Sequence, residues 1–167
     1  MCGAELSQLP NGVQRVAAFL QKAGHTSMPH LLQDAARTAQ QAADALGIEL
    51  GQIAKSIIFK RKSDDTAVLV ITSGDKRVDE AKVQALVCDA GSKLGRADAD
   101  FVKLKTGFSI GGVSPVAHLT KPVTLLDREL FRFETIWAAA GHPNAVFEVS
   151  PSELQLLAQA LVADISL

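Results

Sequence analysis

The sequence predicts a single α+β domain over residues 1–167, with helices around a central mixed, largely antiparallel sheet. Three observations support this fold class. The 167 residues are 47% hydrophobic, which is enough to build the core of one domain. Helical patterns dominate the first part of the chain, and β-rich runs interleaved with helices follow. No repeat, low-complexity tract or linker divides the chain.

The first half of the chain predicts two helices and a hairpin. Residues 12–23 carry apolar side chains at helical spacing, with Asn11 as the expected N-cap and Gly24 as the stop. The alanine-rich segment "DAARTAQQAADALGIEL" predicts a second helix that ends at Gly47. The segment "AKSIIFKRKSDDTAVLVITS" contains two β-rich runs around polar residues 60–65 and predicts a hairpin.

The second half predicts further helices and strands in alternation. "DEAKVQALV" is typical of a helix capped by Asp79, and "DADFVKLKTG" of a helix closed by Gly107. "PVTLLD", "TIWAAAG" and "AVFEV" predict strands. "SPSELQLLAQALVADI" predicts a final helix, with Ser150 as its cap, Pro151 in its first turn and Glu153 as the early acidic residue.

Composition narrows the possible compartments and partners. The formal net charge of -1 gives no global attraction to nucleic acid or to an anionic membrane. Only two cysteines occur, Cys2 and Cys88, as expected for reduced cytosolic thiols rather than a disulfide framework. No signal peptide pattern opens the chain, and no apolar run reaches the ~18 residues of a membrane span. We therefore expect a soluble, unprocessed cytoplasmic protein with no membrane partner.

The stretch "GFSIGGVSPVAHL", residues 107–119, is the first candidate site. Adjacent Gly111 and Gly112 allow positive φ and a close approach of the backbone to a ligand. Pro115 fixes its own φ and disfavours helix at Ser114. The N–H groups of Gly111, Gly112 and Val113 are suitable donors to an oxyanion. Without a ligand, the same pattern would be a turn or a β-bulge.

Two side chains are candidates for chemistry. Lys55 stands between apolar residues in "IAKSIIF". Its ammonium either reaches solvent past the strand end or faces a pocket, where it would pair with a phosphate or ribose or support developing negative charge. Ser114 lacks the G-x-S-x-G pattern and an assigned base, so we favour a pocket or loop hydrogen-bond role over a nucleophile.

The four histidines are His25, His30, His118 and His142, and their spacing matches no metal-binding pattern. We predict no metal and no cofactor. His118 follows the glycine-rich stretch closely, while His25 and Ser27 would line a pocket if the early segment folds over the sheet.

The middle of the chain is mildly basic. Residues 55–105 contain eleven Lys and Arg against eight Asp and Glu, a net charge of +3. These cations either contact RNA phosphates or belong to a solvated hairpin tip and helix start. The candidates for RNA contact are Lys60, Arg61, Lys62, Lys76 and Arg77.

Four segments in order resemble the YbaK/prolyl-tRNA synthetase-associated domain family. They are "AADALGIELGQIAKSIIF", "VITSGDKRVDEAKV", "KTGFSIGGVSPVAHL" and "AAAGHPNAVFEVSPSELQLL", and the resemblance covers roughly residues 25–165. It implies a barrel-like sheet and a stand-alone trans-editing deacylase, which hydrolyses the ester between a wrong amino acid and the terminal adenosine of a tRNA.

The resemblance also implies roles for individual residues. The family lysine maps to Lys55, which helps to position the terminal nucleotide, and its Gly-x-x-x-Pro loop maps to Gly111 through Pro115, whose backbone shapes the aminoacyl pocket. A ribose hydroxyl of the substrate and water take part in the chemistry. The catalytic set is Lys55, Gly111, Gly112 and Pro115, and the substrate-binding set is His25, Ser27, Val113, Ser114, His118, Gly141 and His142.

The expected partner is the acceptor end of a mischarged tRNA, together with a tRNA synthetase or an elongation factor. The expected product is a small amino acid such as Ala, Ser, Thr or Cys, since synthetases discriminate poorly between such side chains. Two other functions stay open at this point: a non-catalytic nucleic-acid-binding or interaction module, and a small-molecule ester hydrolase.

Overall fold

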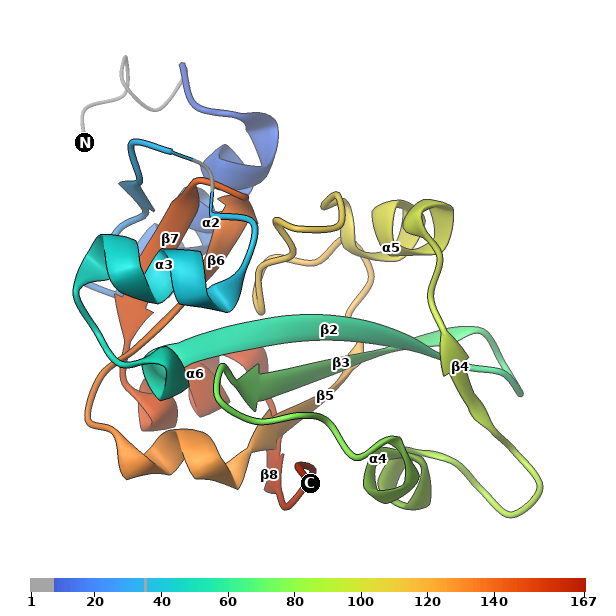
Figure 1. The fold of residues 1–167 in the computed structure, drawn as a ribbon. Helices are drawn as coiled ribbons and strands as arrows, with labels where there is room; N and C mark the ends of the chain where they lie inside the picture. Colours follow the sequence, from blue (N-terminus) through green and yellow to red (C-terminus); the bar gives the residue numbers. More distant parts are fainter. Residues whose placement is uncertain (1–7, 35) are drawn as a thin grey trace.

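The computed structural model describes residues 8–34 and 36–167, in which five α-helices surround an eight-stranded mixed sheet (Figure 1). The helices are α2 (Asn11–Lys22), α3 (Ala39–Leu46), α4 (Glu80–Val87), α5 (Ala99–Thr106) and α6 (Pro151–Ala158), with short 3₁₀ helices η1 (Leu50–Gln52) and η2 (Arg128–Arg132). The strands are β1 (His30–Leu31), β2 (Ile53–Arg61), β3 (Thr66–Ser73), β4 (Leu94–Arg96), β5 (Val123–Asp127), β6 (Ile136–His142), β7 (Ala145–Val149) and β8 (Leu161–Ala163).

The sheet has the order β1-β7-β6-β2-β3-β5-β8, and β4 pairs separately with β2. Four strand pairs are antiparallel, and three, β2 with β6, β3 with β5 and β5 with β8, are parallel. The predicted α+β class with a mixed sheet is confirmed. The barrel is not closed within the described residues, because the short strands β1 and β8 at the two ends pair only with β7 and β5.

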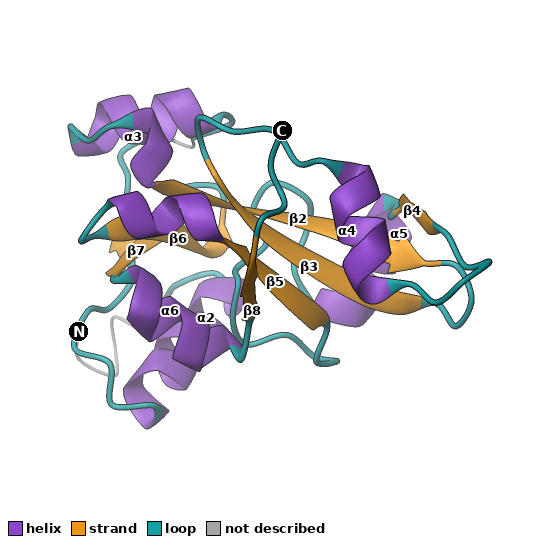
Figure 2. Cartoon of the chain, turned by 90° about the horizontal axis from the view of Figure 1, so that it is seen from below, coloured by secondary structure: helices purple, strands orange, loops and turns teal. Residues whose placement is uncertain are grey.

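The predicted hairpin forms the centre of the sheet. β2 and β3 pair in register from Ala54 opposite Ser73 to Arg61 opposite Thr66. One core cluster packs α2, α6 and the loop after α5 against this hairpin, and a second lies beneath α4. Figure 2 shows α2, α3 and α6 gathered at one end of the sheet, with α4, α5 and β4 at the other. Apolar burial on both faces makes the hairpin a rigid support for the residues it carries.

Local capping signals account for most of the helix ends. Asp79 accepts from the N–H groups of Ala81 and Lys82 at the start of α4, and Ser150 with Glu153 forms a capping box on α6. Gly47 ends α3 in the left-handed conformation, as predicted.

Two predicted helix ends are wrong. Asn11 is the first helical residue of α2 rather than its cap, because Pro10 occupies the N-cap position and makes no side-chain bond. The final helix ends at Ala158, where Gln159 is left-handed, and the segment after it forms β8 beside β5. Long-range pairing of β8 with a buried strand outweighs the helical propensity of "ALVA".

Among residues 8–34 and 36–167, no helix combines the length and apolar character needed to cross a bilayer.

Candidate functional site

A pocket of about 260 Å³ opens where α3, the first half of β2 and the β6–β7 turn meet the glycine loop, residues 107–119. Residues 53–57 of β2, 137–139 of β6, and Gly111 and Val113 of the loop form its walls. In Figure 1 the glycine loop passes above β2, between α3 and α5. Seven of the lining residues are alanines, so the walls are mostly small and apolar.

An interruption in strand pairing creates this pocket. One edge of β2 pairs with β3, whereas the other edge pairs with β6 only at Ile53 and Ala54 and with β4 only at residues 59–61. Between these two contacts, residues 55–58 have no strand partner on this edge in the part of the chain that the structure describes. Their unpaired backbone groups are therefore available to a ligand.

Lys55 lies in this interruption and lines the pocket. Its Nζ donates to the carbonyl oxygen of Lys76 at 3.3 Å, in the turn after β3. Partial burial lowers the pKa of Lys55, the charge of Asp75 raises it, and the charge of Arg77 lowers it again. The structure therefore places Lys55 at the pocket rather than at an unconstrained strand end.

A hydrogen-bond network that the sequence did not reveal holds the turn next to Lys55. Arg132 donates to both carboxylate oxygens of Asp75, at 2.8 and 3.1 Å. Ser73 Oγ lies 2.9 Å from a carboxylate oxygen of Asp75 and 2.6 Å from the carbonyl oxygen of Gly51, and its single hydroxyl proton is donated to one of these two acceptors. The Arg132 guanidinium lowers the pKa of Asp75. Asp75 thus carries a negative charge that favours the ammonium form of Lys55.

The glycine loop presents two free backbone donors. Gly111 has φ +97°, a conformation that requires glycine, and neither its N–H nor that of Val113 has a partner within the described residues. The N–H of Gly112 donates to the carbonyl of Ser109 at 3.0 Å, so it is not the free donor that we expected. A Cβ on Gly112 would lie 2.8 Å from Cα of His142, so this glycine allows the loop to approach the β6–β7 turn.

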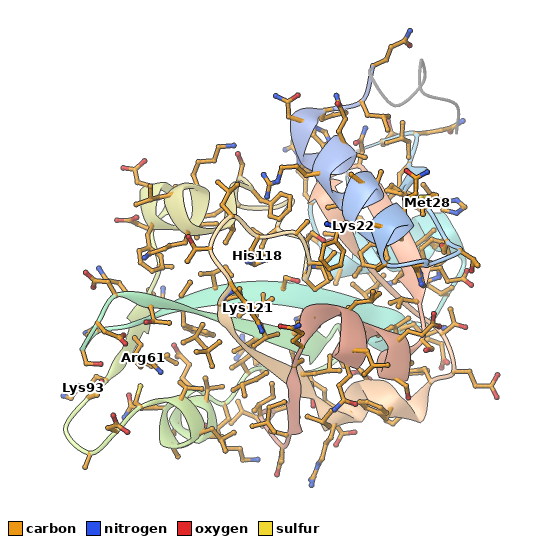
Figure 3. All side chains as sticks on the ribbon, turned by 180° about the vertical axis from the view of Figure 1, so that it is seen from behind. Lys22, Met28, Arg61, Lys93, His118 and Lys121 are labelled. Atoms are coloured by element: carbon orange, nitrogen blue, oxygen red, sulfur yellow. The ribbon has the colours of Figure 1, made fainter. Side chains whose placement is uncertain are left out.

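The rest of the loop lies behind the pocket. Ser114 is fully buried, and its Oγ accepts from the N–H of Val116 at 3.3 Å. Pro115 and His118 line a separate cavity of about 280 Å³. His118 Nε2 donates to the carbonyl of Ser114 at 2.6 Å, and burial lowers its pKa while the Ser114 carbonyl raises it (Figure 3). These residues shape the loop from behind.

Arg15 anchors the loop to α2, although no local pattern in the sequence predicts this role. Its guanidinium donates to the carbonyls of Thr106 at 2.8 Å, Ala117 at 2.6 Å and Gly107 at 3.3 Å. It also lies 4.4 Å from the centre of the Phe108 ring, and burial lowers its pKa. One side chain therefore ties both ends of the loop to the same helix.

The remaining substrate-binding candidates lie in different places. His142 lines the pocket, and its Nδ1 accepts from the N–H of Asn144 at 3.2 Å. His25 lies outside the pocket lining, with Nδ1 at 3.1 Å from Glu153 and Nε2 at 3.0 Å from the carbonyl of Glu148. Ser27 does not line the pocket either. Gly141 has φ +94° and packs against the backbone of Gly12 at the start of α2.

The basic candidates also separate into two groups. Lys60 pairs with Asp65 at 3.3 Å, and Arg61 pairs with Asp64 at 2.8 Å near the hairpin tip, where Figure 3 shows Arg61 next to Lys93. Lys62 is exposed at the same tip. Lys76 and Arg77 instead adjoin Lys55. No cluster of three or more His, Cys, Asp or Glu side chains suited to a metal ion occurs in the described part of the chain.

Known proteins are similar to this chain in sequence. The uncharacterized protein YwhH of Bacillus subtilis is 35% identical over 117 residues, which are 70% of this chain and 72% of YwhH. EbsC of Enterococcus faecalis, named as a candidate Cys-tRNA(Pro)/Cys-tRNA(Cys) deacylase, is 26% identical over 77% of each chain. A proline–tRNA ligase of a Thermoanaerobacter strain is 28% identical over 56% of this chain, which corresponds to 16% of the ligase.

Solved structures with a similar fold and a family model point to the same family as these relatives. The crystal structure of a candidate trans-editing enzyme for prolyl-tRNA synthetase superposes with a TM-score of 0.88 at 38% identity, over 96% of this chain and 99% of that one. The hypothetical protein APE2540 superposes with a TM-score of 0.82 at 32% identity, over 92% of this chain and 99% of that one. The model of the aminoacyl-tRNA editing domain matches residues 33–157, which include Lys55, the glycine loop and the β6–β7 turn. The chain belongs to the aminoacyl-tRNA editing domain family.

Proposed function

We propose that this aminoacyl-tRNA deacylase removes small amino acids, such as Ala, Ser, Thr or Cys, from mischarged tRNA in the pocket beside Lys55. The observation that carries this proposal is the convergence of three features on one cavity of about 260 Å³. They are the half-buried ammonium of Lys55, the free N–H groups of Gly111 and Val113, and walls rich in alanine.

The proposed reaction needs no protein nucleophile. Water adds to the ester carbonyl carbon, the bond from this carbon to the ribose oxygen breaks, and that oxygen takes up a proton as the free amino acid leaves. The N–H groups of Gly111 and Val113 are available to stabilise the oxyanion of the tetrahedral intermediate. Lys55 holds the terminal nucleotide through its phosphate or ribose.

The size of the pocket supports the proposed amino acids. Alanine side chains on several walls leave room for a small aminoacyl group beside the ribose. A difference of one methyl group gives a synthetase only about 1–3 kcal/mol of discrimination, so small amino acids are the ones that most need a second check. A cytoplasmic location and contact with a synthetase or an elongation factor follow from a tRNA substrate and belong to this proposal.

The test is single-turnover deacylation of tRNAs charged with Ala, Ser, Thr, Cys or a large amino acid such as Phe. We expect hydrolysis of one or more of the small esters and none of the Phe ester above the rate without enzyme. A binding module would leave every ester intact. A small-molecule hydrolase would cleave the ester equally well after removal of the RNA body, so the aminoacyl ester of adenosine is the matched substrate.

A further inference from the structure

A second groove, of about 510 Å³, adjoins the pocket on the same strand. Ile57 lines both cavities, so the groove begins where the pocket ends. Its floor includes apolar residues of β2 and the segment before α4, and Arg77 and Arg96 lie along it. We call this feature the arginine groove.

Strand geometry places the groove in line with Lys55. Side chains at alternate positions share one face of a strand, so Lys55, Ile57 and Phe59 lie on the same face of β2. Arg96 of β4 is directly opposite Phe59, and directly opposite residues share a face. At about 3.3 Å per residue, the position of Arg96 is about 13 Å along the strand from Lys55. This distance is longer than one nucleotide.

Arg77 and Arg96 differ from most other arginines of the described chain in the partners of their guanidinium groups. Arg61, Arg128 and Arg132 are each held in an ion pair. The guanidinium groups of Arg77 and Arg96 are exposed and have neither an ion pair nor a hydrogen bond within residues 8–34 and 36–167. Glu80 is the acidic side chain that lines the groove, so its side chains carry a net positive charge. An unpaired guanidinium is suited to a phosphate.

Resting on the proposed function, we propose that the arginine groove binds the unpaired 3′ strand of the tRNA, upstream of the terminal adenosine. A nucleotide strand whose terminal ester lies in the pocket must leave it, and the groove is a continuous exit along β2. Arg77 directly follows Lys76, whose carbonyl accepts from Lys55, so it contacts the phosphate nearer the ester. Arg96 contacts a phosphate further upstream, above an apolar floor suited to bases.

The experiment compares Arg77→Gln, Arg96→Gln and the double variant with Lys22→Gln, which removes an exposed cation at the end of α2. The substrates are alanyl-tRNA and the alanyl ester of adenosine, which lacks the upstream phosphates. Each arginine variant should lower the ratio of kcat/KM on alanyl-tRNA to kcat/KM on alanyl-adenosine by about fivefold or more, as expected for a charged hydrogen bond. Lys22→Gln should keep the wild-type ratio.

Binding of uncharged tRNA, followed by fluorescence anisotropy against salt concentration, is the second measurement. Each single arginine variant should reduce the slope of log affinity against log salt by about 0.7, the value for one phosphate contact to a single strand, and the double variant should reduce it by about 1.4. Unchanged slopes, or an equal loss of activity on both substrates, would overturn the proposal that the arginine groove binds the 3′ strand. If the wild type hydrolyses neither ester, the proposed function fails, and the salt slopes still decide whether the groove binds RNA.

Discussion

The Nζ of Lys55 and the carbonyl oxygen of Lys76 are 3.3 Å apart, and this hydrogen bond fixes the ammonium at the edge of the pocket. Lys76 directly follows Asp75, and Arg132 donates to both carboxylate oxygens of Asp75. The position and charge of the candidate catalytic lysine therefore depend on two segments that are distant from it in the sequence, the turn at residues 75–76 and Arg132.

Lys55→Ala should reduce single-turnover deacylation at least tenfold while thermal melting changes little, because a half-buried lysine contributes little to the core. The pH dependence of deacylation tests the charge of Lys55 separately. The pKa of Lys55 lies below its ordinary value of 10.5, so its ammonium is lost as pH rises through that lowered pKa. Wild-type activity should therefore decrease at alkaline pH, which gives its pH profile an alkaline limb. Lys55→Arg, which stays charged, should not show this limb. Equal rates for wild type and Lys55→Ala at saturating tRNA would exclude the role.

Asp75→Asn should move the alkaline limb to lower pH, because it removes the negative charge that raises the pKa of Lys55. The lost Asp75–Arg132 pair is about one third exposed, so the free energy of unfolding should decrease by only about 0–1 kcal/mol. The control is Asp164→Asn, which removes a comparable ion pair with Lys82 away from the pocket. If both variants give the same pH profile, Asp75 acts on stability alone.

Arg15→Ala should destabilise the protein by about 2–3 kcal/mol, since it leaves the carbonyls of Thr106 and Ala117 without their charged donor. Urea unfolding measures this loss, with the exposed, ion-paired Arg128→Ala as the reference. Deacylation should fall as well, because the loop that carries Gly111 loses its attachment to α2. A stability equal to that of Arg128→Ala would contradict the anchoring role.

Gly112→Ala should impair turnover strongly, because the added methyl would push the loop away from the backbone of His142 and reshape the pocket. Gly91→Ala is the matched control. Gly91 has positive φ and open space around it, so its substitution costs about 1 kcal/mol of stability without altering activity. A fully active Gly112→Ala enzyme would show that the close approach of loop and turn is dispensable.

Ser114→Ala should be milder than Gly112→Ala, because its Oγ makes a buried turn contact with the N–H of Val116. Intact-protein mass spectrometry during turnover should detect no acyl adduct on Ser114. An adduct, or complete loss of hydrolysis in this variant, would point instead to a covalent mechanism.

Much of the fold could be predicted because its signals are local. The caps at Asp79 and Ser150 and the apolar runs of the β2–β3 hairpin act over a few residues. β8 could not be predicted, since it depends on parallel pairing with β5, which lies 36 residues away at Leu125 and Leu161. Local propensity carries no information on such a partner.

The same distinction between local and long-range signals applies to the residues of the candidate site. Lys55 and Gly111 stand out in the sequence because a lysine among apolar residues and a glycine pair are unusual locally. Arg15 and Arg132 do not, because their partners are 91 to 102 and 57 to 59 residues away, and an arginine on a helix is ordinary. The occupied N–H of Gly112 could not be foreseen either, since it depends on the turn that Ser109 makes.

The segment from β8 to Leu167 is synthesised after the glycine loop, and it supports the chain next to Lys55. Leu167 donates its N–H to the carbonyl of Arg77 at 2.9 Å, Ser166 bridges to Val78, and Lys82 donates to the carbonyl of Ser166. These contacts hold the segment that directly follows Lys76, the partner of Lys55. A nascent chain that already contains the glycine loop would still lack this support until residues 166 and 167 have been synthesised.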